Sequence, residues 1–375
     1  MSNIDHIILY SFLFFLMYIW GKENYDKPAT RFWISAVIPI LCYAVITGCR
    51  TWGPDYAWYR YKITHPNEIA VRKDEIIFQG LNGLVRIMGL DAEYGFILYG
   101  IIIMTGAFFF IRSFDDKSKY MFALIVPAIL IETSTHIRQG IAFGVSLMAL
   151  GFLNKKNWWL FAFFSLVAFN IHKISALISC ACLISYFFRN KIIPLQISVA
   201  AYCVAIVLPE YINYDLLHKI IGVLPVEGSK YQVYIDELPF WFSTRANRAD
   251  WVQSLPALIL SALFDLSIMI LSYKYLKIIG NRSVAMYYNL FVLGAVLTRA
   301  FFLNELLIRM VYQFYMFYFV PLGYCLYLYN IVDVPLVQRR INAVAVCFGC
   351  MMLYLCLYWG RFIILNENGL FIWSR

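Results

Sequence analysis

The stretch from Tyr94 to Ile111 reads YGFILYGIIIMTGAFFFI and contains no charged side chain. An α-helix needs about 20 predominantly apolar residues to cross the hydrocarbon core of a bilayer. We therefore expect a membrane-spanning helix over 94–112. Apolar runs of the same kind recur on both sides of this one, and this repetition indicates a polytopic membrane protein.

The composition supports the same class. Of the 375 residues, 62% are hydrophobic and 14% are charged, whereas soluble globular proteins have about 25% charged residues. A water-soluble enzyme and a disordered chain are therefore excluded. The chain is interpreted as one integral-membrane domain over 1–375, an all-α bundle of about 12 (roughly 11 to 13) helices. The expected spans are 7–20, 32–49, 94–112, 119–134, 137–153, 157–171, 172–188, 192–209, 255–275, 284–303, 306–330 and 341–360.

The distribution of basic residues predicts the orientation of these spans. The chain has 31 Lys and Arg against 22 Asp and Glu, a net charge of +9. In a membrane protein this excess reports orientation and lipid contact rather than nucleic-acid binding. Basic residues are concentrated in the short connections after the odd-numbered spans, which the positive-inside rule assigns to the cytoplasm. Both termini are then expected outside.

Two long segments, 50–93 and 210–254, fall on the external side in this topology. Long connections in a tightly connected bundle are usually functional or carry structure of their own. In the first segment, 75–88 has apolar residues at helical spacing, which predicts an amphipathic helix at the outer leaflet. The second is rich in Tyr, Trp and Pro; its aromatic residues are interpreted as interfacial anchors or as platforms for a sugar.

Polar motifs follow one another along the predicted external side. Each one opens a helix or follows one, and each has an ordinary structural explanation, such as a turn, a cap or an i,i+4 pair. The motifs are Arg50-x-x-Gly53-Pro54-Asp55-Tyr56-x-x-Tyr59, Glu75-x-x-Phe78-x-x-Leu81-Asn82, Arg138-Gln139-x-x-Ala142, His172-Lys173-x-Ser175-Ala176 and Glu305-x-x-x-Arg309-x-x-Tyr312.

In this order, over residues 50–320, the motifs resemble the EpsG-like branch of the Wzy-type polymerases, which polymerise O-antigen, capsule or exopolysaccharide repeat units. The proline between Gly53 and Asp55 and the isoleucines after Glu75 depart slightly from the family pattern. The resemblance implies a GT-C-like helical bundle in the bacterial inner membrane, with its active site on the periplasmic or external face. It also implies transfer of a growing glycan from undecaprenyl diphosphate to the non-reducing end of another lipid-linked repeat unit.

A diphosphate leaving group requires cations that stay charged and can bind bidentately. Arg50, Arg138 and Arg309, together with Lys173, supply such a cluster on the predicted external side. Because these cations can replace a metal at the diphosphate, no cofactor is expected. The absence of a P-loop and of G-x-G-x-x-G in the sequence argues against nucleotide use.

The acceptor hydroxyl requires a base, for which His172, Asp55 and Glu75 are the candidates. His172 ranks first and Asp55 second, although His172 also suits a satisfied helix terminus and Asp55 a turn. The supporting residues on the same side are expected to be Tyr56, Tyr59, Gln139, Glu305 and Tyr312.

The resemblance also names partners: lipid-linked oligosaccharide as donor and acceptor, membrane lipids, and a flippase and chain-length regulator of the same export pathway. A lipid-linked oligosaccharide flippase is the main alternative function. It would place ionisable groups at the bilayer midplane, where Asp265 is the principal example here. A membrane O-acyltransferase is the third interpretation. Separately, Asp91-Ala92-Glu93 resembles an acidic pair of metal-dependent glycosyltransferases but also suits a helix start.

Overall fold

The computed structural model describes residues 2–49, 56–65, 76–210, 255–302 and 305–331, together with residue 349. Within these ranges the ordered elements are all helices, which confirms the all-α prediction for this part of the chain. The chain divides into two compact units, residues 1–187 with 319–375 (unit 1) and residues 188–318 (unit 2). Each unit is described by itself.

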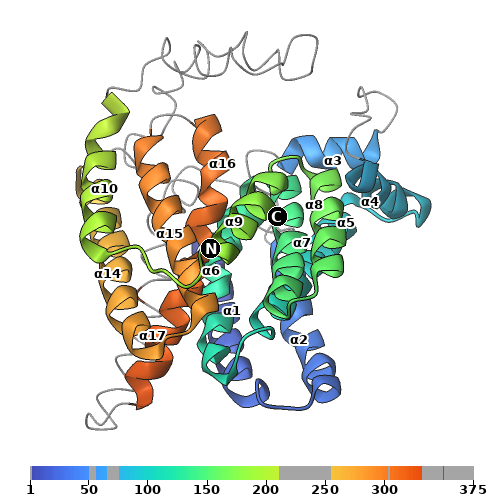
Figure 1. The fold of residues 1–375 in the computed structure, drawn as a ribbon. Helices are drawn as coiled ribbons and strands as arrows, with labels where there is room; N and C mark the ends of the chain where they lie inside the picture. The colour runs from blue at the N-terminus through green and yellow to red at the C-terminus, as the bar shows by residue number, and fades with distance from the viewer. Residues whose placement is uncertain are drawn as a thin grey trace. The chain divides into compact units, whose positions relative to one another are not determined.

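Unit 1 contains most of the helices (Figure 1). They are α1 (Ser2–Asn24), α2 (Ala29–Gly48), α3 (Tyr56–Thr64), α4 (Ile76–Ile87), α5 (Ala92–Ile111), the 3₁₀ helix η1 (Asp116–Tyr120), α6 (Met121–Thr135), α7 (Ile137–Asn154), α8 (Trp158–Ile171), α9 (Ser175–Phe187) and α17 (Phe319–Ile331).

Close backbone contacts hold the centre of unit 1 together. A Cβ atom added to Gly106 of α5 would overlap the carbonyl oxygen of Gly144 on α7. In lipid, small residues of this kind let helices approach closely enough for dispersion forces to hold them. Further along, Gly151 of α7 meets Phe109 of α5. The two helices therefore run in the same direction, and their first residues lie at the same end of unit 1.

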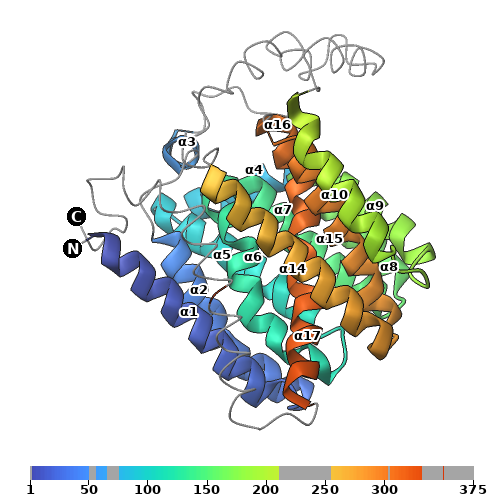
Figure 2. The same ribbon diagram turned by 90° about the vertical axis from the view of Figure 1, so that its left-hand side faces the viewer.

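Unit 2 consists of α10 (Leu195–Val207), the 3₁₀ helix η2 (Leu208–Glu210), α14 (Leu255–Ile279), α15 (Arg282–Ala300), α16 (Glu305–Tyr315) and the 3₁₀ helix η4 (Met316–Tyr318). Figure 2 shows α10, α14 and α15 side by side. Asn281 caps α15 by accepting from the backbone N–H groups of Ser283 and Val284. Asn289 of α15 binds the chain just before α10, through Lys191 O and Ile193 N.

Five helices in the described ranges are long and apolar enough to cross a membrane, namely α2, α5, α7, residues 258–277 of α14, and α15. They coincide with expected spans, which confirms the membrane-protein class. The count of twelve stays a prediction, since the expected span 341–360 falls outside the described residues apart from residue 349. The proposed external segment 210–254 also lies there, apart from Glu210.

Most helix limits differ from the expected ones by a few residues, and in two spans a particular residue explains the difference. The span 306–330 consists of α16 and α17 with the 3₁₀ turn η4 between them. Pro321 explains the interruption because it has no N–H to donate to the carbonyl of Phe317. The span expected to begin at His172 begins instead at Ser175, because His172 has an extended backbone that ends α8.

The amphipathic helix expected over 75–88 is confirmed as α4. Its protein-facing side consists of Phe78, Asn82 and Val85, so the polar Asn82 lies on the buried face. Ile87 at 86% and Ile76 at 66% are the most exposed of its apolar side chains. A helix that packs through one face and exposes isoleucines on another suits the predicted position at a lipid interface.

Candidate functional site

One end of unit 1 brings several of the predicted residues together, and we call it the Arg138 end. Arg138 is the second residue of α7, and the parallel helix α5 begins at the same end. Helix α8 returns there because a short turn connects it to the other end of α7. The short helices α3 and α4 pack on α5, and α4 also packs on α8 (Figure 1).

The guanidinium of Arg138 is held by α3 and α4. Its Nε donates a hydrogen bond of 2.6 Å to the hydroxyl of Tyr59. Its central carbon lies 5.5 Å, 5.8 Å and 5.9 Å from the ring centres of Trp58, Tyr59 and Phe78. Cations at such distances are attracted to aromatic rings. The motif containing Tyr59 and the motif that begins with Arg138 therefore meet in space.

A second layer of contacts fixes the residues that hold Arg138. Phe78 packs edge-to-face on Tyr59 with ring centres 5.7 Å apart. One turn further along α4, Asn82 accepts a hydrogen bond from the hydroxyl of Tyr99 on α5. The Phe and Asn of the Glu75-x-x-Phe78-x-x-Leu81-Asn82 motif thus dock α4 onto unit 1 and set the position of Tyr59.

Glu93 connects α3 to the start of α5. Its Oε1 accepts a hydrogen bond of 3.4 Å from the hydroxyl of Tyr56 and lies 3.6 Å from Nε of Arg60. Tyr56 also stacks on Phe96 at 5.0 Å. Asp91 stands at the N-cap position of α5, though its side chain makes no capping bond. Sequence reasoning placed Glu93 at a helix start and missed its contacts with α3, because Glu93 lies 37 positions from Tyr56 in the sequence.

His172 and Lys173 lie in the turn between α8 and α9. The Nδ1 of His172 accepts from the backbone N–H of Ile174 at 3.3 Å. This bond favours the neutral tautomer that carries its proton on Nε2. Lys173 places its Nζ 4.0 Å from the ring centre of Phe169 on α8. Gln139 of α7 is buried, so it belongs to the packed interior of unit 1.

The remaining predicted residues fall elsewhere. Arg309 and Tyr312 lie one turn apart on α16 of unit 2, where Arg309 is half-buried and Tyr312 is buried. Glu305 begins the same helix. The convergence of Arg309 with Arg138 on one diphosphate stays a prediction. Arg50, Asp55 and Glu75 lie outside the described residues, as does the side chain of Glu305.

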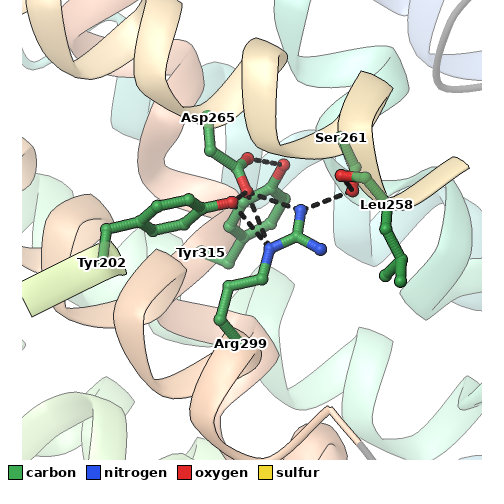
Figure 3. Close-up of polar contacts among 6 residues, drawn as sticks. All are labelled: Tyr202, Leu258, Ser261, Asp265, Arg299 and Tyr315. Atoms are coloured by element: carbon green, nitrogen blue, oxygen red, sulfur yellow. Dashed lines mark hydrogen bonds and ion pairs between the residues drawn. The ribbon is translucent and has the colours of Figure 1, made fainter. Parts of the chain in front are cut away.

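Unit 2 contains a polar cluster that sequence reasoning did not identify as a site (Figure 3). Asp265 of α14 forms an ion pair of 2.8 Å with Arg299 of α15, and Tyr202, Ser261 and Tyr315 complete the group. Asp265 stands out in the sequence as an acid inside an apolar run. The partner of Asp265 could not be recognised from the sequence. Arg299 lies near the end of its own apolar run, where an arginine usually reaches the membrane interface.

The Arg138 end is suited to an anionic ligand. Among the described residues there, the cations Arg60, Lys62 and Arg138 outnumber the acids Asp91 and Glu93, and Arg138 is fixed by a hydrogen bond and by aromatic rings. A guanidinium keeps its charge at any physiological pH and offers a planar fork that fits phosphate oxygens. Because its position is already set, little conformational entropy is lost when an anion binds.

Comparison with known proteins gives one positive result. The family model described as EpsG family matches residues 33–372, nearly the whole chain. No curated protein and no solved structure matches the chain significantly. The matched range includes every motif that carried the resemblance in the sequence, and the chain therefore belongs to the EpsG family of Wzy-like polymerases.

Proposed function

We propose that this protein polymerises polysaccharide by transferring a growing glycan from undecaprenyl diphosphate to the non-reducing end of a second lipid-linked repeat unit. Membership of the EpsG family supports polymerase activity in general. The single structural observation that carries the proposal is the hydrogen bond between Arg138 and Tyr59, which joins two separate family motifs around a fixed guanidinium.

The reaction breaks the bond between the anomeric carbon of the donor glycan and the oxygen of its diphosphate. A hydroxyl oxygen of the acceptor sugar forms the new glycosidic bond, its proton passes to a base, and undecaprenyl diphosphate leaves. Negative charge therefore develops on the diphosphate oxygen in the transition state. Arg138, with Arg50, Arg309 and Lys173 as its proposed partners, stabilises that charge; one well-placed donor of this kind can contribute about 3 kcal/mol.

His172 has two possible roles in this scheme. With Nδ1 bound to the N–H of Ile174, the neutral ring carries its proton on Nε2. Donation from Nε2 to a diphosphate oxygen uses the tautomer that this bond favours. To act as the base, the ring of His172 must first release the N–H of Ile174 or adopt the other tautomer. Asp55 and Glu75 are the other proposed bases, and carboxylates can accept the proton without a change of tautomer.

Tyr56, Tyr59, Gln139, Glu305 and Tyr312 are proposed to support the sugar or the charged groups. The fold is proposed to be a GT-C-related bundle of about 12 helices in the bacterial inner membrane, with both termini and the Arg138 end on the external face. Its proposed partners are a flippase and a chain-length regulator of the same pathway, and no cofactor is required in this scheme.

The test is reconstitution of the purified protein in lipid with an undecaprenyl-diphosphate-linked repeat unit from its host. The mixture contains no nucleotide and no added metal, and lipid-linked products are separated on a gel. A ladder of lengthening products is expected. If folded protein binds the substrate but leaves only monomer, the polymerase proposal fails and the flippase and acyltransferase interpretations are tested next.

A further inference from the structure

The side chains around Asp265 form a closed hydrogen-bonded group inside unit 2 (Figure 3). Its five members are Tyr202 of α10, Ser261 and Asp265 of α14, Arg299 of α15 and Tyr315 of α16, and we call it the Asp265 cluster. Four helices thus contribute to one group of contacts. The side chain of Asp265 is 2% exposed, and a carboxylate at such a position requires several donors to stay charged.

Both oxygens of Asp265 are occupied, and each has its own donors. Oδ2 accepts from the Tyr202 hydroxyl at 2.5 Å and from Nη2 of Arg299 at 2.8 Å. Oδ1 accepts from the Tyr315 hydroxyl at 2.8 Å. A carboxylate only accepts, so both tyrosines must donate to it, and their orientations are fixed.

Arg299 fixes the opposite side of the same group. Its Nε donates to the Tyr202 hydroxyl at 2.7 Å, and its Nη2 donates to Ser261 Oγ at 2.5 Å. Ser261 in turn donates to the carbonyl of Leu258. A buried ion pair is often no more stabilising than apolar side chains of the same size. In this cluster the ion pair fixes the directions of the hydrogen bonds, because it determines which hydroxyl binds which carboxylate oxygen.

Tyr315 is the last residue of α16 and is held at two points. Its hydroxyl binds Asp265, and its backbone lies against Gly294 of α15 so closely that a Cβ on Gly294 would overlap the Tyr315 nitrogen. Its ring packs on Tyr312, with centres 5.4 Å apart. Tyr312 is one turn from Arg309 on the same helix, so the contacts at Tyr315 set the position of the helix that carries Arg309.

We propose that Asp265 is a positioning residue, which acts through Tyr315 to hold α16 so that Arg309 can bind the diphosphate of the lipid-linked substrate. This inference rests on the proposed function of Arg309. The Asp265 cluster then contributes to substrate binding indirectly, because none of its five side chains need touch the substrate.

Two hydroxyl deletions on the same carboxylate provide the test. Tyr315→Phe removes the donor on α16, and Tyr202→Phe removes the donor on α10, a helix without proposed substrate contacts. The intact protein in nanodiscs is titrated with undecaprenyl diphosphate, and thermal unfolding of each variant is recorded. Both variants are expected to lose similar thermal stability. Only Tyr315→Phe is expected to weaken binding, by about tenfold or more, since small misplacements of binding groups are costly.

A third comparison separates positioning from a general loss of structure. In an Arg309→Ala background, Tyr315→Phe is expected to cause no further loss of affinity, because the group it positions is gone. Equal effects of the two hydroxyl deletions on binding, or a Tyr315→Phe effect that persists without Arg309, would overturn the inference. Wild-type protein that does not bind undecaprenyl diphosphate would also overturn it. A wild-type protein that binds this lipid in an Arg309- and Tyr315-dependent way but forms no ladder would instead refute the polymerase proposal alone.

Discussion

Arg138 and Tyr59 are 79 positions apart in the sequence, and the Nε of one donates to the hydroxyl of the other at 2.6 Å. Tyr59 belongs to the short helix α3, whereas Arg138 is the second residue of the buried helix α7. The bond therefore ties a peripheral helix to the centre of unit 1. It also leaves a positively charged, planar group fixed at the end where α5 and α7 begin.

Replacing Arg138 by lysine keeps the charge but removes the planar fork. We expect Arg138→Lys to lower the polymerisation rate by about 100-fold, the effect of removing one well-placed charge-stabilising donor. The rate is measured from the product ladder, per folded molecule.

Arg112 provides a matched control, because it follows the far end of α5. Its Nη atoms donate to the carbonyls of Tyr25 and Lys27, and it lies over the Tyr25 ring. Burial raises the pKa of Tyr25 still further above neutral pH, and its hydroxyl donates to Phe114 O. Arg112→Lys should cost about 1 to 3 kcal/mol of stability without lowering activity per folded molecule. Equal losses of activity in both variants would argue against a specific role for Arg138.

Tyr59→Phe keeps the aromatic ring beside Arg138 and removes only the hydroxyl. A hydrogen bond to a charged group is worth about 1.5 to 3 kcal/mol, so we expect activity to fall by at least about tenfold. Tyr61→Phe, on the same helix, should have little effect because Tyr61 is exposed and stacks on His65. The two initial rates are compared at saturating substrate. Activity unchanged in Tyr59→Phe would show that the rings alone hold Arg138.

Substitutions at His172 distinguish its two proposed roles. His172→Ala should abolish the polymer and leave a folded protein. Glutamine can place an N–H near the position of Nε2, whereas asparagine cannot reach it. If Nε2 donates to the diphosphate, His172→Gln should retain more activity than His172→Asn. If His172 is the base, all three variants should be equally inactive. A full ladder from His172→Ala would move the role of base to Asp55.

Gly294→Ala should destabilise unit 2, because the added Cβ would overlap the backbone of α16 at Tyr315. Overpacking of this kind costs about 1 to 3 kcal/mol. The control is Gly80→Ala on α4, where a Cβ meets nothing within 4 Å. Alanine is the better helix former by up to about 1 kcal/mol, so this variant should be neutral or slightly stabilising. Thermal unfolding checks both, and a stable Gly294→Ala would contradict the close contact of α15 with α16.

The sequence was sufficient to locate the long apolar helices of the described ranges, because apolar length reflects the thickness of the bilayer directly. It also predicted α4, whose spacing is amphipathic, but it did not predict the short helix α3. It could not show that Phe78 and Asn82 face inward, since both faces of α4 contain apolar residues and only the packing distinguishes them. The interruption at η4 was not predicted because the apolar run continues through it, although Pro321 is visible in the sequence.

The candidate site could be predicted only in part, because packing also determines which of its residues meet. Family motifs indicated Tyr59 and Arg138 separately, but their pairing depends on how α3 packs on α4 and α5. The Asp265 cluster depends even more on tertiary structure, since its members come from four helices and span residues 202–315. A charge in an apolar run signals that a partner must exist, but the sequence does not say which residue that partner is.

In the proposed reaction, each new glycosidic bond is formed with the release of one undecaprenyl diphosphate. The most direct measurement is to count undecaprenyl diphosphate released against glycosidic bonds formed, using reconstituted protein and a lipid-linked repeat unit labelled in its phosphates. We expect one undecaprenyl diphosphate for every new bond, with the release slowed in parallel in Arg138→Lys. Product that lengthens without release of undecaprenyl diphosphate would contradict the polymerase proposal.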